Sequence, residues 1–374
     1  MPKLIIISNT SWNLYNFRLP LMRKLREAGH EVVAMAPYDE YSDRLADAGF
    51  RYADLPMNNK GTNPIEDIGF SIRLFKLFRR ERPSVVLTYT PKPNIYASIA
   101  GGFSRTAVIP NISGLGATFI RQGLVTRIIK FLYRWALRYP QCVFFQNHDD
   151  LNLFVSLGLV KKEVAKRIPG SGIDTKVFSP LSAESSETGS ATIFLLVARI
   201  LWDKGVGEYV EAARMLKQKY PDAEFQLLGF LDVENPQAVP REKVEEWVAE
   251  GVINYMGKTD SVIDIMREAD CVVLPSYREG LPRTLIEAGS LAKPIVTTDT
   301  AGCRDVVDDG VTGLLCELKS ADDLADKMEK IIDMSAAERL GMGELGREKI
   351  VREFDEKIVI DMYVAAIRSI EIKR

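Results

Sequence analysis

Residues 274–288 of this 374-residue chain have the sequence Leu-Pro-Ser-Tyr-Arg-Glu-Gly-Leu-Pro-Arg-Thr-Leu-Ile-Glu-Ala. The stretch begins at the end of an apolar run, Cys271–Leu274, which is typical of a buried β-strand. A loop with Glu279 and Gly280 follows, and Pro282 suits the opening turn of a helix. A strand that passes through a short loop into a helix is the repeating unit of an open α/β sheet. Ligands bind such sheets outside the carboxyl ends of the strands, so this loop is the first candidate for a site.

The same alternation of strand and helix extends over both halves of the chain. Apolar runs predict strands at residues 4–8, 31–36, 84–88, 143–146, 193–197, 224–228, 271–274 and 294–297. Helices are predicted near residues 17–28 and 207–219, and the polar segment 181–190 has the composition of a linker. We therefore predict an α/β protein with two doubly wound, Rossmann-like domains that face each other across a crevice. The predicted domains are residues 1–180 and 181–354, with a C-terminal helix at about 355–374 that packs back on the first.

Composition limits the class of protein. The chain is 46% hydrophobic and 27% charged, which is ordinary for a globular protein, and its length favours two domains. It has no apolar run long enough to span a bilayer, and a strand is predicted directly at residues 4–8, so no signal peptide is expected. The four cysteines form no C-x-x-C pair, so buried free thiols in a reducing compartment are expected. Two histidines argue against a His-rich metal site, and we predict no metal.

The 274–288 loop has residues suited to a ligand that carries phosphate and hydroxyl groups. A helix N-terminus offers N–H groups to a phosphate, and Gly280 lets the backbone come close because it has no side chain. Carboxylates such as Glu279 and Glu287 accept hydrogen bonds from vicinal hydroxyls. Two glutamates at this spacing are more often a solvated pair on a helix, so the strand–loop–helix context carries the prediction.

A second loop, Ala198–Gly205, follows the strand at 193–197 and carries two cations. Arg199 and Lys204 are five residues apart and could neutralise a diphosphate and the charge that develops on it as a bond breaks. The alternative is a pair of surface cations beside a Lys-Gly turn.

These motifs resemble the donor site of glycosyltransferase family 4, whose members have the GT-B fold. The resemblance rests on Arg199, Lys204-Gly205 and Glu279-Gly-Leu-Pro…Glu287-Ala288, and on the segment Gly172–Phe178. The stretches Leu201–Val206 and Thr298–Cys303 are similar, more narrowly, to bacterial enzymes that add N-acetylgalactosamine by α-1,3 linkage to undecaprenyl-diphosphate-linked oligosaccharides.

The resemblance implies a role for each matching residue. Arg199 and Lys204 would hold the diphosphate of a UDP-sugar, Gly280 and Leu281 would offer backbone N–H groups, and Glu287 would bind the ribose. Glu279, the expected catalytic residue, would contact the hydroxyls of the transferred sugar, and Pro282 would complete the donor site. The family is retaining and generally metal-independent, so no cofactor is expected. Where many members have a Gly-Gly pair in the first loop, this chain has Ser11–Arg18.

The acceptor site is less clearly marked. Asn13 follows the first strand, Lys92 lies in the turn Thr90-Pro-Lys-Pro-Asn94, and Gly114 begins a Gly-Leu-Gly stretch whose third fingerprint position is occupied by Phe119. All three are candidates for contacts with the acceptor. A rigid proline-flanked turn is an equally good explanation for Lys92.

Charge is divided unevenly between the halves. Residues 1–180 have 25 Lys+Arg and 14 Asp+Glu (25 − 14 = +11), and the remainder has 24 and 37 (24 − 37 = −13). A helix is predicted over 121–139, on which Arg127, Lys130, Arg134 and Arg138 fall within about 80° of one another, beside an apolar face with Trp135. This pattern indicates a helix at an anionic membrane surface. An ordinary amphipathic helix packed on the sheet is the alternative, and no nucleic-acid motif accompanies the charge.

The sequence therefore predicts a retaining glycosyltransferase on the cytoplasmic face of the cell membrane, peripherally attached. It would move an N-acetylhexosamine or hexose from a UDP-sugar to a polyprenyl-diphosphate-linked glycan, in assembly of cell-envelope polysaccharide or glycoprotein glycan. No nucleic acid is expected as a partner. A nucleotide-sugar epimerase or hydrolase on the same fold and a non-catalytic membrane-docking protein are the alternatives.

Overall fold

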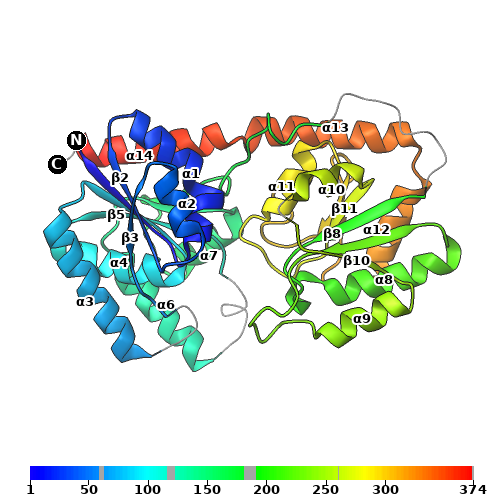
Figure 1. Ribbon diagram of the computed structural model, residues 1–374, viewed down its shortest axis with the longest axis horizontal. Coiled ribbons are helices and arrows are strands. Elements are labelled where there is room, and N and C mark those ends of the chain that lie inside the picture. Colours follow the sequence, from blue (N-terminus) through cyan, green and yellow to red (C-terminus); the bar gives the residue numbers. More distant parts are fainter. Residues whose placement is uncertain (59–62, 116–122, 181–190, 260, 373–374) are drawn as a thin grey trace. The chain divides into compact units, whose positions relative to one another are not determined.

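The computed structural model describes residues 1–374 except 59–62, 116–122, 181–190, 260 and 373–374 (Figure 1). The predicted linker at 181–190 and the residues Gly116, Phe119 and Arg121 therefore lie outside the described residues. The chain divides into two compact units, Met1–Ser171 with Glu356–Arg374, and Gly172–Asp355.

The first division falls before the predicted one at residues 180 and 181. The segment that begins at Gly172 is bound within the second unit, because Ile173 N donates to Phe354 O (3.0 Å). The carbonyl of Phe178 accepts from Ser290 Oγ (2.6 Å) and from Arg347 Nη1 (3.0 Å). These partners are more than a hundred residues away in sequence, so they were not predictable from the local composition. The composition indicated a boundary at the polar segment 181–190 instead.

The first unit contains, within the described residues, a seven-stranded parallel sheet with the order β3-β2-β1-β4-β5-β6-β7. Its strands are β1 (Lys3–Ile7), β2 (Glu31–Ala36), β3 (Arg51–Asp54), β4 (Val85–Tyr89), β5 (Ala107–Ile112), β6 (Val143–Phe145) and β7 (Ala165–Arg167). Its helices are α1 (Ser11–Glu27), α2 (Tyr41–Asp47), α3 (Pro64–Glu81), α4 (Pro91–Ser104), α6 (Leu124–Ala136), α7 (His148–Ser156) and α14 (Glu356–Ile372).

Helices cover both faces of this sheet. The core on one face joins the sheet to α1, α2 and α14, and the core on the other joins it to α3, α4, α6 and α7. Figure 1 shows α3, α4 and α6 grouped on one side of the sheet and α1 and α14 on the other. The C-terminal helix α14 buries Val359, Tyr363, Ile367 and Ile370, at the spacing of one helix face. Tyr363 Oη also accepts from Asn111 Nδ2 (2.7 Å), which fixes α14 to β5.

The second unit contains a six-stranded parallel sheet among its described residues, with the order β10-β9-β8-β11-β12-β13. Its strands are β8 (Ile193–Val197), β9 (Glu224–Leu228), β10 (Asn254–Gly257), β11 (Cys271–Leu274), β12 (Ile295–Thr298) and β13 (Leu314–Cys316). Its helices are the 3₁₀ helix η1 (Trp202–Lys204), α8 (Val206–Lys219), α9 (Arg241–Ala249), α10 (Val262–Glu268), α11 (Arg283–Ser290), α12 (Ala321–Asp333) and α13 (Ala336–Glu353).

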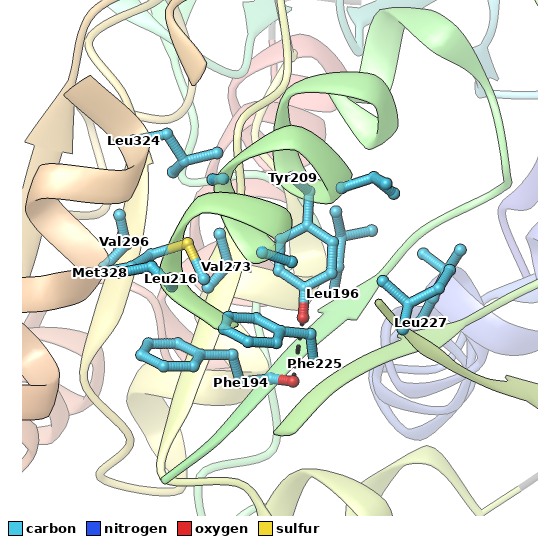
Figure 2. Packing of buried hydrophobic residues seen from close by; sticks show 14 of the residues in the cluster. Phe194, Leu196, Tyr209, Leu216, Phe225, Leu227, Val273, Val296, Leu324 and Met328 are labelled. Atoms are coloured by element: carbon cyan, nitrogen blue, oxygen red, sulfur yellow. Dashed lines mark hydrogen bonds between the residues drawn. The ribbon is translucent and has the colours of Figure 1, made fainter. Parts of the chain in front are cut away.

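The core of this unit holds β8 and β9 against α8 (Figure 2). Phe194 and Phe225 stack with their ring centroids 5.4 Å apart. Tyr209 of α8 is buried above them, and its hydroxyl donates to Phe194 O at 3.0 Å, so the polar end of the ring is satisfied inside the core (Figure 2). This packing fixes the start of α8, and with it the loop that carries Arg199 and Lys204.

The predicted α/β fold of two doubly wound units is confirmed, and the strands at 31–36, 193–197, 224–228 and 271–274 have the predicted bounds. The first helix was placed wrongly, because α1 begins at Ser11 and the supposed loop 11–18 forms its first turns. Thr10 caps this helix, and Asp39 Oδ2 accepts from the N–H groups of Ser11 (2.8 Å) and Trp12 (3.1 Å). Asp39 comes from the loop after β2 and was not predictable from the local sequence, whereas Thr10 is a residue type that commonly caps helices.

Candidate active site

The strand order of the second sheet reverses between β8 and β11. These two strands lie side by side, but the chain leaves them in opposite directions across the sheet, β9 and β10 to one side and β12 and β13 to the other. The loops after β8 and β11 therefore leave the same edge at a topological switch point, where open α/β sheets bind their ligands. They are the two loops singled out by the sequence.

The two loops are tied to each other by backbone contacts. Tyr277 N donates to Asp203 O (2.9 Å), and Ser276 Oγ lies 3.2 Å from the same carbonyl oxygen. Gly205 adopts φ +73°, and a β-carbon there would lie 2.1 Å from Pro275 O. Only glycine fits this close approach, which explains the Lys-Gly pair that the sequence displayed.

Lys204 and Glu279 meet between these loops. Lys204 Nζ lies 2.5 Å from Glu279 Oε1, and the two side chains are only 15% and 16% exposed. Ser276 Oγ donates to the same carboxylate oxygen at 2.8 Å. The structure thus brings the predicted phosphate-binding cation and the predicted sugar-binding carboxylate into direct contact. A largely buried, charge-assisted pair of this kind holds both groups in one geometry.

Arg199 differs from Lys204 in its surroundings. Its side chain is exposed, at the start of the loop after β8. Within the part of the chain that the structure describes, no salt bridge involves Arg199. The two predicted donor cations therefore lie on one loop, one of them held by a carboxylate and the other facing solvent.

The end of β12 and the residues that follow it are hydrogen-bonded to the Glu279 loop. Glu279 N donates to Ala301 O (3.1 Å), and Thr298 Oγ1 donates to Ser276 O (2.5 Å). Gly302 has φ +83°, and a β-carbon there would lie 2.7 Å from Glu279 O. Burial, with Glu279 nearby, raises the pKa of the Cys303 thiol to about 12, so this cysteine is a neutral packing group at the site.

Helix α11 carries the second glutamate. Pro282 precedes its first turn as the N-terminal capping residue, and Glu287 lies one turn further along. Arg283 Nε donates to Glu287 Oε1 at 2.7 Å, and the Glu287 side chain is 14% exposed. Burial raises the pKa of Glu287, and the Arg283 charge opposes that shift. Gly280 is buried and Leu281 half-buried between the two glutamates, so the whole predicted set from Glu279 to Glu287 lies on one loop and helix.

The acceptor candidates lie at the carboxyl edge of the first sheet. Strands β1, β4 and β5 are neighbours, and Asn13, Lys92 and Gly114 follow them in that order. Ser8 Oγ donates to Asn13 Oδ1 (3.1 Å), and Gly114 has a positive φ of 121°. Lys92 pairs with Asp67 (2.8 Å), so its position is explained in part by a bridge between α4 and α3.

Two family models together match most of the chain. Residues 17–170 match the glycosyl transferase 4-like domain, and residues 180–349 match glycosyl transferases group 1. The second match covers every donor residue described above. This protein is a family 4 glycosyltransferase with the GT-B fold.

Curated relatives agree with this family. The glycosyltransferase is 28% identical, over 96% of both chains, to N,N'-diacetylbacillosaminyl-diphospho-undecaprenol alpha-1,3-N-acetylgalactosaminyltransferase of Campylobacter jejuni. It is 23% identical to UDP-Gal:alpha-D-GlcNAc-diphosphoundecaprenol alpha-1,3-galactosyltransferase of Escherichia coli, over 85% of this chain and 83% of that enzyme. Both relatives are transferases, which argues against the epimerase, the hydrolase and the non-catalytic docking protein.

Solved structures have the same fold. A glycosyltransferase of Rickettsia africae superposes with a TM-score of 0.82 at 16% identity, over 99% of this chain and 98% of that one. The Anabaena protein HepE in complex with UDP superposes with a TM-score of 0.79 at 15% identity, over 99% and 100% of the two chains.

Sequence reasoning missed several residues of the glycosyltransferase that the structure places at these edges. Ser276 bonds Glu279, and its place at the end of β11 was the available signal. Tyr277 Oη donates to Glu208 Oε1 (2.6 Å), which ties the Glu279 loop to α8. In the first unit, Arg18 is 4% exposed and lies 3.9 Å above the Tyr89 ring, a buried cation that had seemed to belong to a loop.

Helix α6 of the glycosyltransferase spans Leu124–Ala136, shorter than the 121–139 predicted, and Arg138 lies in the turn beyond it. It packs inward through Thr126, Tyr133 and Ala136, in part as the amphipathic alternative expected. Arg134 Nη2 donates to Leu157 O (2.8 Å), and Trp135 is half-buried with its ring 6.4 Å from that of Phe103. Four apolar side chains of the helix stay at least half exposed: Leu124, Val125, Ile128 and Phe131.

The described residues lack two features, a membrane-spanning helix and a metal-binding cluster. They contain no helix that is long and apolar enough to span a membrane. They also contain no cluster of three or more His, Cys, Asp or Glu side chains arranged to hold a metal ion. All four cysteines are buried and free.

Proposed function

We propose that this glycosyltransferase moves a hexose or N-acetylhexosamine from a UDP-sugar to a polyprenyl-diphosphate-linked glycan, with retention of the anomeric configuration. The proposal rests on the buried Lys204–Glu279 pair at the switch point of the second sheet. The curated relatives act on diphospho-undecaprenol-linked acceptors, as their names state, and the Anabaena structure contains UDP. The product would enter cell-envelope polysaccharide or a glycoprotein glycan.

Each residue of the donor site has a proposed role in binding the UDP-sugar. Lys204 and Arg199 would bind the diphosphate and stabilise the charge that grows on it as the glycosidic bond breaks. Glu279, held in place by Ser276 and Lys204, would accept hydrogen bonds from the sugar hydroxyls next to the reacting carbon. Gly280 and Leu281 would offer N–H groups, and Glu287 would accept from the ribose.

We further propose that transfer needs no metal ion and no cofactor. A diphosphate leaving group must be neutralised by some cation, and Arg199 with Lys204 supplies two positive charges on the loop after β8. The test is transfer in the presence of EDTA, which should leave the rate unchanged.

We propose in addition that the protein attaches peripherally to the cytoplasmic face of the membrane through α3 and α6. Between residues 71 and 140 the chain has twelve Lys+Arg and one acid, Glu81. Exposed cations beside exposed apolar side chains favour an anionic lipid surface.

The function is tested by following UDP release from a panel of UDP-sugars, with and without an undecaprenyl-diphosphate-linked glycan. We expect release to depend on the acceptor and the product to have an α linkage by NMR. Release at the same rate without acceptor would mark a hydrolase, and a β product would show that the enzyme inverts.

A further inference from the structure

An apolar groove lies between α3, α4 and α6 of the first unit. It encloses about 920 Å³, at the upper end of the range for small-molecule sites. Its sides include Ile68, Ile72 and Phe75 of α3 and Val125 and Ile128 of α6, and α4 supplies Ile99. Asp67 and Lys92 are the charged residues among those that line it. We call this the α3–α6 groove.

The apolar side chains that line the groove are unusually exposed to solvent. Ile68 is 60% exposed, Ile72 and Ile128 are each 50% exposed, and Phe103 is 63% exposed. Apolar surface of this extent in one concave place is typical of a ligand groove or a membrane contact, because its contact with water is unfavourable. The concave shape favours a chain that enters the groove over a flat surface that covers it.

One end of the groove is polar. Asp67 there accepts from Lys92 Nζ (2.8 Å) and from Tyr96 Oη (2.8 Å), so both of its oxygens are bound. Lys92 is in the first turn of α4, directly after β4, and therefore lies at the carboxyl edge of the first sheet. An ammonium group donates three hydrogen bonds, so the Asp67 contact leaves Lys92 able to bind a phosphate oxygen as well.

The helices that form the sides are basic. Exposed Lys76 and Arg79 on α3 and exposed Arg127 on α6 accompany the apolar lining. Arg79 follows Ile72 and Phe75 by seven and four residues, so it continues the same row of α3 side chains. A groove with apolar sides and cationic helices complements an amphiphile that has an apolar chain and an anionic head.

We propose that the α3–α6 groove binds the isoprenoid chain of the lipid-linked acceptor, with the diphosphate at the Lys92 end. This proposal rests on the proposed function, because that function supplies the lipid diphosphate. The acceptor's own chain is favoured over a phospholipid for a geometric reason. A headgroup held at Lys92 lies at the carboxyl edge of β4, among Asn13 and Gly114, where an acceptor sugar has to be presented.

The probe is farnesyl diphosphate in detergent-free buffer, with binding measured by titration calorimetry. The groove variants are Ile72→Gln and Ile128→Gln, both at half-exposed positions where a polar side chain is tolerated by the fold. The controls are Leu124→Gln and Phe131→Gln on α6, the helix of Ile128; these residues are 74% and 67% exposed and lie outside the groove lining. We expect each groove variant to bind about tenfold more weakly and each control to bind like the parent.

Three results would overturn the proposal. Inorganic diphosphate could bind as tightly as farnesyl diphosphate, the controls could lose as much affinity as the groove variants, or dihexanoyl phosphatidylglycerol could compete on equal terms. The second would show that the affinity does not come from the residues that line the groove, and the third that the groove takes bulk phospholipid.

Failure of the groove and failure of the proposed function give different patterns. If acceptors with long and short isoprenoid chains are glycosylated with equal KM, the function stands and the groove assignment falls. If farnesyl diphosphate binds as expected but no lipid-linked glycan accepts sugar, the groove stands and the function falls. UDP binding by the groove variants should equal that of the parent in either case, because the donor residues belong to the other unit.

Discussion

The loops after β8 and β11 and the basic stretch from α3 to α6 use charge in different ways. In the donor region two cations lie against carboxylates in largely buried pairs, Lys204 with Glu279 at 2.5 Å and Arg283 with Glu287 at 2.7 Å, while Arg199 faces solvent. From residue 71 to 140, by contrast, twelve cations face a single acid in the sequence, and many of them are exposed. Buried pairs act over hydrogen-bond distances and fix geometry, whereas exposed charges act together as a field that salt screens over about 8 Å.

Salt and single substitutions therefore test these two regions in complementary ways. A change at the buried Lys204–Glu279 pair should have a large effect at any ionic strength. The basic stretch should tolerate single changes and respond strongly to salt.

The largest effect is expected from Glu279→Gln. The amide keeps the size of the side chain and can accept from Ser276, but it loses the charge that Lys204 holds and that the sugar hydroxyls need. We expect turnover to fall by about 100- to 1,000-fold, the scale of removing one preorganised group from an active site. The Kd for UDP should stay within a few-fold of that of the parent, measured by calorimetry.

The matched control for this variant is Glu242→Gln, which changes an exposed glutamate of α9 in the same unit. It should leave turnover unchanged. A folded Glu279→Gln protein with near-normal turnover would mean that Glu279 only positions Lys204.

The next effect concerns vesicle binding by a variant with four cations replaced by glutamine, Arg127, Lys130, Arg134 and Arg138. Each cation near an anionic surface contributes about 1 kcal/mol, so the set should weaken binding by at least about 100-fold. Binding of the parent to vesicles with anionic lipid should fall as salt rises, and binding to neutral vesicles should be weak throughout. Co-sedimentation at several salt concentrations measures both.

The control removes four exposed cations elsewhere in the first unit, Arg23, Lys24, Lys161 and Lys162. It changes net charge equally and should bind vesicles nearly as well as the parent. If the two variants behave alike, net charge and not α6 governs attachment. Arg134 also donates to Leu157 O, so Arg134→Gln alone, measured for stability, separates that structural contact from the lipid contact.

The donor site was largely predictable because its parts are local. Each loop follows an apolar strand directly, and the parallel sheet places the carboxyl ends of neighbouring strands at one edge. The direct contact of Lys204 with Glu279 was not predictable, because it depends on β8 pairing with β11 across 75 residues of sequence. For the same reason the role of Asp39 at the start of α1 was invisible.

The charge pattern of the basic stretch was predictable from the sequence, but the packing of its helices was not. A helical wheel gives the charge and the apolar arc of α6, but it cannot say which apolar side chains pack inward. The structure buries Tyr133 and Ala136 and leaves Ile128 and Phe131 exposed, because α4 meets only part of the arc. The α3–α6 groove follows from that incomplete packing.

A smaller effect should distinguish the two donor cations. Lys204→Ala and Arg199→Ala each remove one charge-assisted contact to a phosphate oxygen, about 2 kcal/mol or thirtyfold in the Kd for UDP. Lys204→Ala also leaves the Glu279 carboxylate without its cation in a largely buried place, so it should unfold at lower temperature, whereas Arg199→Ala should not. Unchanged UDP affinity in both variants would place the diphosphate elsewhere.

The smallest effect concerns pH and Glu287→Gln. Burial raises the pKa of Glu287 in the folded protein above its ordinary value of 4.5, against the opposing charge of Arg283. Below that ordinary value the carboxyl is protonated in both states, and its contribution to stability is fully present. As pH rises, the unfolded chain ionises first, so the folded state loses stability until the pH exceeds the folded pKa. Glutamine does not titrate, so the Tm of the variant should rise relative to that of the parent as pH increases above 4.5, until the folded carboxyl has ionised.

Calorimetric unfolding of both proteins across this pH range measures the difference, with exposed Glu348→Gln as the control that should track the parent. Because Glu287 and Arg283 are close and largely buried, 0.5 M salt should leave the pH-dependent difference nearly unchanged, while the same salt should release the protein from anionic vesicles. A difference that salt abolishes would mean that the α11 pair is screened like a surface charge. The charges of the donor region and of the basic stretch would then differ in where they lie in the sequence, but not in how they act.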